Sequence, residues 1–410
     1  MMEAKVWTVN LKVRLFGEAF FNLVYWMIFP FLVVYFSTAF GNHIAGLLMM
    51  IPPIVGMIGG LISGHYTDLI GRRPLMLLGV CIQASMFAVF AATSSSWIEF
   101  AAYVLVGLGG AIYRTPSMAM VADLVPKEER RQVIATFTTA NNIGAVLGPA
   151  LGAFFFFQYR DQLLWTATFI LLLYAITIFL MIRETKPQVE KAADTPKQQT
   201  PMNYRFIFQD KLFFFFILAG VFSIMTIMQL DLYLAIYIVN YVPEQTLFSW
   251  NEWSLTLTSE QIFGWVLGLN GLLFVLLILP VTKWLKGWSE RNVFILSALL
   301  AGIGMFAVGL HSSLWYLFIV TVIFTLGELI RAPVTESFVA NYAPEHARGQ
   351  YLGASNLQFT VGRFLAPITV FLSAWVQPIV VFSLLLGFSI ISSLLYLYVF
   401  RLYLSRQPYV

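Results

Sequence analysis

The sequence predicts an all-α integral membrane protein with twelve transmembrane helices, arranged as two six-helix repeats. Three observations carry this prediction: the composition, the spacing of apolar runs and an internal repeat. Hydrophobic residues make up 59% of the chain and charged residues only 11%, with a mean hydropathy of +0.80. Soluble domains contain about 25% charged residues, so this composition excludes a soluble protein.

Apolar runs of about 20 residues, the length that crosses about 30 Å of hydrocarbon, recur along the whole chain. The first half contains six such runs, near residues 15–37, 44–63, 75–93, 97–120, 132–156 and 163–182. The second half contains six more, near 211–240, 261–281, 292–310, 314–336, 351–375 and 379–402. The first run is too long for a signal peptide and lacks a cleavage pattern before Gly41, so each run is a predicted transmembrane helix.

The two halves repeat each other at a fixed interval. Arg73 and Arg291 lie 218 residues apart. The same interval separates further identical pairs, which are Pro126 and Pro344, Arg130 and Arg348, Gln132 and Gln350, Gly144 and Gly362, and Pro149 and Pro367. Chance does not explain these matches, because prolines, arginines and glutamine are rare in apolar segments. In transporters, repeats of this kind place a substrate site at the repeat interface near the bilayer midplane.

The repeat predicts two bundles joined by a linker. We expect an N-terminal six-helix bundle over residues 1–183 and a C-terminal six-helix bundle over residues 211–410. The stretch between them, residues 184–210, begins with a polar, proline-rich segment without hydrophobic periodicity. This composition is typical of a flexible cytoplasmic linker.

The distribution of basic residues predicts the orientation. With both termini in the cytoplasm, only Arg160 of the 24 Lys and Arg residues lies in an outer loop, and Arg114, Arg331 and Arg363 lie within helices. The remaining 20 are then cytoplasmic, as the positive-inside rule requires. We therefore expect a multi-pass protein of the plasma membrane, whose formal charge of +4 reflects orientation and not nucleic-acid binding.

The sequence carries no pattern of a catalytic or metal site. It has no phosphate-binding loop of the Gly-x-x-x-x-Gly-Lys-Ser/Thr type, no clustered His/Cys spacing and no nucleophile elbow. Its four histidines are scattered over loops and helix ends. We expect no enzymatic activity, no cofactor and no metal site.

A charged loop between the second and third predicted helices is the strongest local motif. Its spacing is Gly-x-x-x-Asp-x-x-Gly-Arg-Arg, formed by Gly64, Asp68, Gly71, Arg72 and Arg73. An anion here can pair with arginines and with helix N-termini, so we expect a cytoplasmic gate around Asp68. Arg363, expected near the inner end of the eleventh helix, is its predicted partner from the other half.

This loop resembles the signature between helices two and three of the major facilitator superfamily, and the two six-helix repeats match that family along nearly the whole chain. A second resemblance lies in the fifth predicted helix, in the antiporter motif Gly-x-x-x-Gly-Pro-x-x-Gly-Gly of the drug:proton antiporter branch. The chain matches it at Gly144, Gly148, Pro149 and Gly152, with alanine at the last position. The resemblance implies export and a functional monomer.

The residues of the fifth-helix motif predict a close contact with another helix, at a point where the fifth helix can bend. Glycines four residues apart line one face of a helix and permit close backbone approach. A proline bends the helix because it removes a backbone hydrogen bond. Ordinary packing of small residues between membrane helices is the alternative interpretation of the glycines, and it explains the adjacent proline less well.

Charged residues inside the predicted helices are candidates for proton coupling: Glu328, Asp231, Arg331 and Arg114. An ionised side chain is costly in hydrocarbon, so such residues face a cavity or a partner and are functional candidates by default. Glu328 lies in the middle of its helix, with Arg331 at i+3, close enough to pair. The alternatives are a fixed structural ion pair at Glu328 and, for Asp231 in the outer part of the seventh helix, an acid wetted by outside water.

The resemblance is closest to multidrug:proton antiporters of Gram-positive bacteria, which carry an acid in helix seven and a glutamate in helix ten. Asp231 and Glu328 occupy these places. The acid that such proteins carry in helix five is missing from residues 135–142. Arg114 resembles the helix-four arginine of the family, and the resemblance implies that it relays protonation to the gate.

Two further acids have local interpretations. Glu18 follows Arg14 by four residues, a spacing that allows an ion pair on one helix face, and we expect this pair to anchor the inner membrane interface. Asp123 lies at the inner end of the fourth predicted helix, too far from Arg114 for a direct pair.

Together these features predict a proton-driven exporter of lipophilic, cationic small molecules that works by alternating access. Its expected partners are the lipophilic substrate, protons and membrane lipids. Two alternatives stay open, because a fold fixes neither substrate nor direction. One is a lipid or lysolipid translocase, or a solute:proton symporter, on the same fold. The other is a non-transporting membrane sensor or scaffold.

Overall fold

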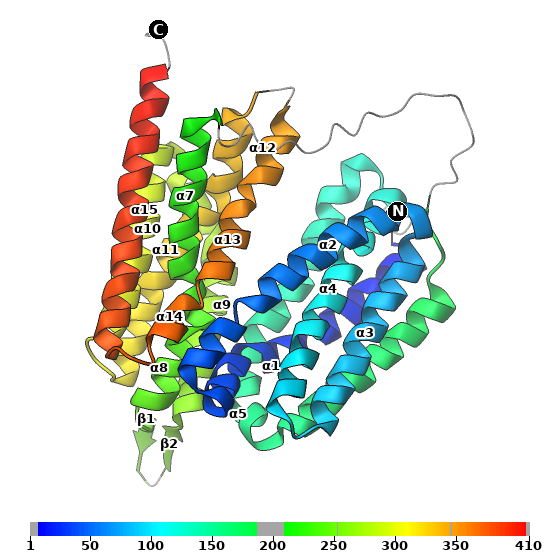
Figure 1. Cartoon of the computed structure of the whole chain (residues 1–410), viewed down its shortest axis with the longest axis horizontal. Helices are drawn as coiled ribbons and strands as arrows, with labels where there is room; N and C mark the ends of the chain where they lie inside the picture. The colour runs from blue at the N-terminus through cyan, green and yellow to red at the C-terminus, as the bar shows by residue number, and fades with distance from the viewer. Residues whose placement is uncertain (1–6, 187–208, 252, 345–346, 407–410) are drawn as a thin grey trace. The chain divides into compact units, whose positions relative to one another are not determined.

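The computed structural model describes residues 7–186, 209–251, 253–344 and 347–406, which are almost wholly helical (Figure 1). Two compact units are found. The first comprises Met1–Gly41 and Ile51–Ala192, and the second comprises Asn42–Met50 and Ala193–Val410. The predicted linker lies mostly outside the described residues, and its predicted bounds stay a prediction.

The helices of the first unit are long and follow one another closely. They are α1 (Val9–Leu48), α2 (Ile51–Ile70), α3 (Arg72–Ala92), α4 (Ser96–Leu124) and α5 (Lys127–Met181). Helix α1 is interrupted at Gly41, whose φ of 77° is readily adopted only by glycine. The last residues of α1, from Asn42 onward, pack with the second unit.

The second unit contains shorter helical pieces and one β-hairpin. Its elements are α7 (Lys211–Ile227), the 3₁₀ turn η2 (Met228–Asp231), α8 (Tyr233–Tyr241), β1 (Gln245–Trp250), β2 (Trp253–Leu257), α9 (Ser259–Trp284), η3 (Leu285–Gly287), α10 (Glu290–Val308), α11 (Leu314–Tyr342), α12 (Arg348–Ser355), α13 (Leu357–Leu365), α14 (Ile368–Leu372) and α15 (Pro378–Arg406). The strands pair antiparallel, with Gln245 opposite Leu257. No strand was expected in this connection between α8 and α9.

Helix α5 is two antiparallel arms, because its backbone leaves the helical region at Tyr159. A single helix of 55 residues would be about 80 Å long, far more than one membrane crossing. The first arm runs in the same direction as α1: Gly144, Gly148 and Gly152 approach Leu23, Trp26 and Met27 in turn. The second arm runs in the opposite direction, since Tyr174 packs on Gly17 and the Arg183 backbone bonds to Asn10.

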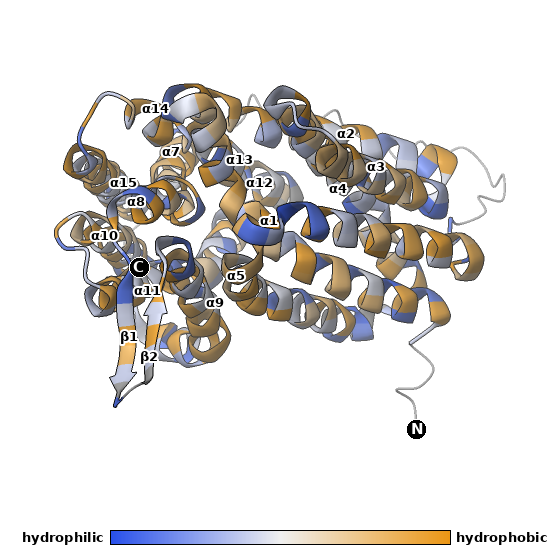
Figure 2. Ribbon diagram, turned by 90° about the horizontal axis from the view of Figure 1, so that it is seen from below, coloured by the Kyte–Doolittle hydropathy of each residue, from blue (hydrophilic) through white to orange (hydrophobic). Residues whose placement is uncertain are grey.

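Nine helices of the described residues are long and apolar enough to cross a membrane. Helix α5 counts once among them although it contains two predicted spans. Helix α2 and the broken run α12–α14 are not among the nine. Exposed leucines such as Leu61, Leu180 and Leu279, each about 70% exposed, and the hydrophobic residues along the helices (Figure 2) fit a lipid environment. The chain is a multi-pass membrane protein, and the count of twelve spans stays a prediction.

The internal repeat is visible in the helix boundaries. Helix α4 spans Ser96–Leu124 and α11 spans Leu314–Tyr342, so both have 29 residues and start 218 residues apart. Helices α3 and α10 begin at Arg72 and Glu290, the same interval. The interval that relates identical residues in the sequence therefore also relates equivalent helices.

Two helices of the second unit that the sequence predicts as continuous are broken. Helix α7 ends at Ile227, and η2 precedes Leu232, whose ψ of −101° lies outside the helical region. The predicted eleventh helix consists of α12, α13 and α14. Pro367 contributes to the break between α13 and α14, because it has no N–H and its ring clashes with the preceding turn.

The side chain of Gln229 connects the break after α7 with the break between α13 and α14. It is fully buried and donates hydrogen bonds to the carbonyl oxygens of Met225, at 2.7 Å, and Ala366, at 3.1 Å. Its side-chain oxygen accepts a hydrogen bond of 2.7 Å from Thr369. Carbonyl groups that the helix breaks release therefore find a donor inside the unit, as hydrocarbon requires.

The glycines of the fifth-helix motif let α5 approach α1 directly. A Cβ on Gly148 would lie 2.4 Å from the Cβ of Trp26, and one on Gly152 would lie 2.3 Å from the backbone oxygen of Met27. Real Cβ atoms do not come so close to backbone atoms, so only glycine fits at this contact. Pro149 lies between the two contact positions.

We predict that Gly152→Ala destabilises the protein. The added methyl group overlaps the α1 backbone, and overpacking of this kind costs about 1–3 kcal/mol. Thermal unfolding of the purified protein in detergent measures the effect as a lower midpoint temperature. Gly107→Ala is the matched control, since a Cβ there meets nothing within 4 Å. Equal midpoints for the two variants would refute the packing role of Gly152.

The N-terminus of α3 is capped by a residue distant in sequence. Gly71 precedes the helix with φ of 118° and has no side chain to cap it. Instead, the carboxylate of Glu184 accepts hydrogen bonds from the backbone N–H groups of Arg72, at 2.9 Å, and Arg73, at 3.1 Å. A negative charge at a helix N-terminus is stabilising. A Cβ on Gly71 would lie 2.5 Å from Glu184 Oε2, so the cap also requires glycine.

Two effects act on the pKa of Glu184. Partial burial raises it, but hydrogen bonds from the backbone N–H groups of Arg72, Lys186, Arg73 and Thr185 outweigh burial, and the pKa falls below its ordinary value of 4.5. The cap therefore stabilises the fold above pH 4.5, and this contribution is lost as the pH falls through the lower pKa of the folded state.

We predict that Glu184→Gln lowers the unfolding temperature at pH 7, and that the difference from the parent shrinks as the pH is lowered progressively below 4.5. At neutral pH the variant lacks the charge that faces the helix N-terminus, whereas at low pH the parent lacks it too. Thermal unfolding in lipid nanodiscs over this pH series measures this. The control is Glu244→Gln, at an exposed position. A difference that persists unchanged at low pH would contradict an electrostatic cap.

Candidate functional site

Glu328 lines a cavity of about 270 Å³ inside the second unit. It lies in α11 and accepts a hydrogen bond of 3.2 Å from the side-chain amide of Asn270 in α9. The same amide donates to Thr325, at 3.0 Å. Much of the cavity wall is apolar and includes Ile227, Phe274 and Phe359. The carboxylate therefore sits where a polar or charged group of a ligand can meet it in apolar surroundings.

Arg331 lines the same cavity but does not pair with Glu328. Its guanidinium donates to Gln358 Oε1, at 2.6 Å, and to the hydroxyl of Tyr396, at 3.3 Å. Arg331 is only 6% exposed, and within the described residues no carboxylate lies within 4 Å of it. The predicted i+3 pair is therefore wrong, because neutral partners from α13 and α15 hold the guanidinium instead. This also removes the alternative of a fixed ion pair at Glu328.

Asp231 ends the 3₁₀ turn between α7 and α8. The negative charge of Asp231 acts on Glu328, and the positive charge of Arg363 acts on Asp231. In the second unit, three predicted site residues therefore lie close enough for their charges to interact: Glu328, Asp231 and Arg363. Arg363 was predicted to face Asp68, which belongs to the first unit, and that contact stays a prediction.

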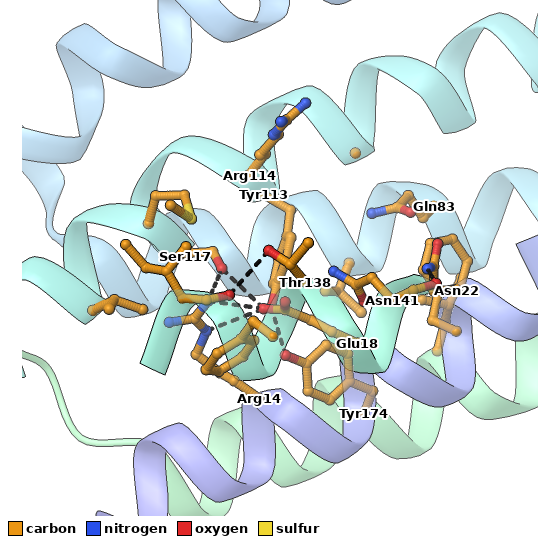
Figure 3. A pocket seen from close by; sticks show the side chains of 18 residues that line it. Arg14, Glu18, Asn22, Gln83, Tyr113, Arg114, Ser117, Thr138, Asn141 and Tyr174 are labelled. Carbon is orange, nitrogen blue, oxygen red and sulfur yellow. Dashed lines mark hydrogen bonds and ion pairs between the residues drawn. The ribbon is translucent and has the colours of Figure 1, made fainter. Parts of the chain in front are cut away.

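A second cavity, of about 470 Å³, lies inside the first unit (Figure 3). At its centre, one oxygen of Glu18 accepts four hydrogen bonds. Arg14 donates two, from Nε at 3.1 Å and Nη2 at 2.9 Å, while Tyr113 donates at 2.5 Å and Ser117 at 2.9 Å. The hydroxyl of Tyr174 continues the network to Tyr113, at 2.6 Å. Residues of α1, α4 and the second arm of α5 are thereby joined.

The predicted ion pair between Arg14 and Glu18 is confirmed at 2.9 Å, and its predicted place at the inner membrane interface stays a prediction. Arg14 is 1% exposed, and its guanidinium stacks on the ring of Phe137, 4.8 Å from the ring centre. One nitrogen, Nη1, is buried and has no hydrogen-bond partner among the described residues. Helices α4 and α5 cover the pair, and both of its residues line the cavity.

Polar side chains extend the cavity away from the ion pair. Asn22 donates a hydrogen bond of 2.6 Å to the backbone of Asn141, and Gln83 lines the same side. Figure 3 shows Arg114 pointing away from Glu18, toward the rim. Arg114 is exposed, and no hydrogen bond to it is found in the part of the chain that the structure describes. Its predicted relay role stays a prediction.

The loop motif forms the corner between α2 and α3, and ion pairs of Arg72 link this corner to α4. Arg72 binds Asp123 through Nε, at 2.8 Å, and Asp68 through Nη1, at 3.3 Å. The same Nη1 donates to the carbonyl oxygen of Thr67, at 3.1 Å. Asp123 therefore pairs with Arg72, and the prediction that it does not pair with Arg114 is confirmed. The Asp68 side chain is 73% exposed, so it keeps most of its surface accessible.

The other residues of the loop motif have separate environments. Arg73 donates to the backbone oxygen of Phe179 and stacks on the ring of that residue, at 5.4 Å. A Cβ on Gly64 would meet nothing within 4 Å. Packing within the first unit thus explains Gly71, through the Glu184 cap, but not Gly64.

Sequence reasoning missed the neutral residues that hold the charged groups of both cavities, directly or through one intermediate: Asn270, Gln358, Tyr113, Ser117 and Tyr174. One signal was available, because Asn270 is an isolated amide in an apolar run, and polar residues inside a span mark functional or structural sites. The others bond to Glu18, to Arg331 or, for Tyr174, to Tyr113, across large separations in sequence, such as 95 residues between Tyr113 and Glu18. No local pattern reveals such contacts.

Comparisons with known proteins agree along the whole chain. The model of the Major Facilitator Superfamily matches residues 15–257 and 233–408. A Na⁺, Li⁺, K⁺/H⁺ antiporter of Planococcus maritimus is 36% identical over 99% of this chain and 99% of its own length. The multidrug resistance protein MdtH of Yersinia enterocolitica is 25% identical over 83% of this chain and 80% of its own length.

Solved structures show the same fold. The crystal structure of a POT family transporter in complex with 5-aminolevulinic acid covers 94% of this chain and 95% of its own, with a TM-score of 0.75 at 17% identity. Family, relatives and fold agree that the protein is a transporter and not an enzyme. The chain belongs to the Major Facilitator Superfamily.

Proposed function

We propose that this transporter is a proton-coupled antiporter that exports lipophilic cations from the cytoplasm by alternating access. The observation that carries the proposal is the environment of Glu328. Its carboxylate faces a cavity with many apolar walls, receives a hydrogen bond from the amide of Asn270, and is not paired with Arg331. Such an acid can hold either a proton or a cation, and this competition couples the two fluxes.

Several further observations support the proposal. The motif that resembles that of drug:proton antiporters forms a close α1–α5 contact. Among the relatives, one is named a cation/proton antiporter and another a multidrug resistance protein. The concentration of basic residues on one side favours a plasma-membrane protein with cytoplasmic termini. We further propose that the monomer is the functional unit.

Alkali metal cations are the second candidate substrate. The relative from Planococcus maritimus carries Na⁺, Li⁺ and K⁺ in its name and matches nearly the full length of this chain. In membrane transporters, carbonyl groups of unwound helices coordinate such ions. Here the break between α7 and α8 lies directly after Asp231, at Leu232, and the charge of Asp231 acts on Glu328. Either cation would thus compete with protons at the same acids.

We predict that Glu328→Gln abolishes substrate-evoked proton movement. The amide cannot exchange a proton, so binding of a cation no longer displaces one. The measurement is the internal pH of proteoliposomes after addition of lipophilic cations, neutral drugs, lysolipids, or Na⁺, Li⁺ and K⁺ salts. Glu244→Gln, an exposed acid outside the cavity, is the control and should behave like the parent.

The panel separates the candidate functions. Proton movement with lipophilic cations but not with salts supports drug antiport, and the reverse supports alkali-cation antiport. Movement that persists in Glu328→Gln contradicts the role of this residue. A folded parent that responds to no compound contradicts antiport and favours a translocase or a non-transporting sensor.

We predict that Asp68→Asn slows transport while substrate binding is partly kept. Asp68 is an exposed partner of Arg72 and lies outside both cavities, so its loss should affect the gate and not the binding site. Transport rates in proteoliposomes and equilibrium binding of the same substrate in detergent measure the two effects. Unchanged turnover would exclude Asp68 from the gate.

A further inference from the structure

An apolar groove of about 490 Å³ runs along the first unit between α1 and the second arm of α5. On α1, an exposed stripe at i, i+4 and i+8 is formed by Lys12, Phe16 and Phe20, and the two phenylalanines are 63% and 60% exposed. Leu173 lines the facing wall and is 47% exposed. Lys12, near the start of α1, is the only charged side chain among the described residues that line the groove. The groove thus presents hydrocarbon-like walls with one basic end.

Tyr174 belongs to both this groove and the polar cavity around Glu18. Its ring lies flat against the backbone of Gly17, where a Cβ would come within 2.2 Å of two ring atoms. Its hydroxyl points to Tyr113 on the cavity side (Figure 3), at 2.6 Å. Tyr174 itself is only 5% exposed. One aromatic ring therefore separates the exposed apolar groove from the polar cavity.

We propose that the groove is a lateral binding site for lipophilic molecules dissolved in the bilayer, and that the Tyr174 ring is the shutter between this site and the cavity of Glu18. The absence of a side chain at Gly17 leaves the ring held by packing and by its bond to Tyr113. Rotation of the ring away from Gly17 would join the two spaces.

The chemistry along this route fits an amphipathic molecule. Aromatic and aliphatic side chains of the groove accept its apolar part, which enters from hydrocarbon without crossing water. Beyond the shutter, Asn22, Asn141 and Gln83 offer hydrogen bonds to its polar part. The assignment of the ligand class rests on the proposed export of lipophilic compounds, whereas the route itself does not depend on proton coupling.

A chemical accessibility experiment tests the route without requiring transport. The single Cys81 is replaced in Cys81→Ser, and Thr138→Cys places a thiol in the polar cavity, which Thr138 lines. Proteoliposomes are treated with a long-chain alkyl maleimide that resides in the bilayer, or with a charged, water-soluble maleimide. The two labelling rates are compared with and without changes at Tyr174.

We predict that Tyr174→Ala accelerates labelling by the alkyl maleimide about tenfold or more, because the open form of a closed shutter is a minor state of at most about 10%. The rate with the water-soluble maleimide should stay unchanged. Tyr174→Phe, which keeps the ring but loses the bond to Tyr113, should give a smaller increase. Leu173→Trp, which narrows the groove, should slow the alkyl maleimide alone.

The outcomes are decisive in either direction. Equal acceleration with both reagents would show general loosening of the bundle and overturn the proposal. An unchanged alkyl rate in Tyr174→Ala, with Leu173→Trp also without effect, would overturn it as well. Repeating the assay in Glu328→Gln separates the two hypotheses, since the route should persist there even when antiport is lost.

Discussion

Hydrocarbon provides no water for polar groups, and this constraint explains most of the described structure. Each buried charge or amide must find its partner inside its own bundle. Arg14 meets Glu18, Arg331 meets Gln358 and Tyr396, and Gln229 meets the carbonyl groups freed where helices break. Because the partners of Arg331 and Gln229 lie on other helices, the same bonds that satisfy these polar groups also fix how the helices pack.

Much of the fold could be predicted from the sequence, because membrane insertion imposes length and composition on each span. The 218-residue interval reappears in the starts of α4 and α11, and the family assignment is confirmed. The breaks of the seventh and eleventh helices could not be predicted. A hydrogen bond between Gln229 and Thr369, which are 140 residues apart, connects the two breaks. A hydropathy pattern carries no information about such a contact.

Charged residues are rare in membrane spans, and this rarity made part of the site predictable. Rarity identified Glu328, Asp231, Arg331 and the Arg14–Glu18 pair, but it could not identify their partners. The expected bond between Arg331 and Glu328 followed from helical spacing alone, and two residues on neighbouring helices compete successfully for the guanidinium. Neutral polar side chains carry no comparable signal, although they make up most of the polar lining of both cavities.

The cap that Glu184 places on α3 also determines where the connection between the two bundles begins. The chain leaves α5 at Met181, but Glu184 and Lys186 bind the start of α3 and the end of α2, the latter through the Leu69 carbonyl. The described part of the connection, up to Lys186, is therefore fixed to the α2–α3 corner and not only to the last helix of the bundle. That corner contains Asp68 and Arg72, so the residues that follow α5 are bonded directly to the proposed gate.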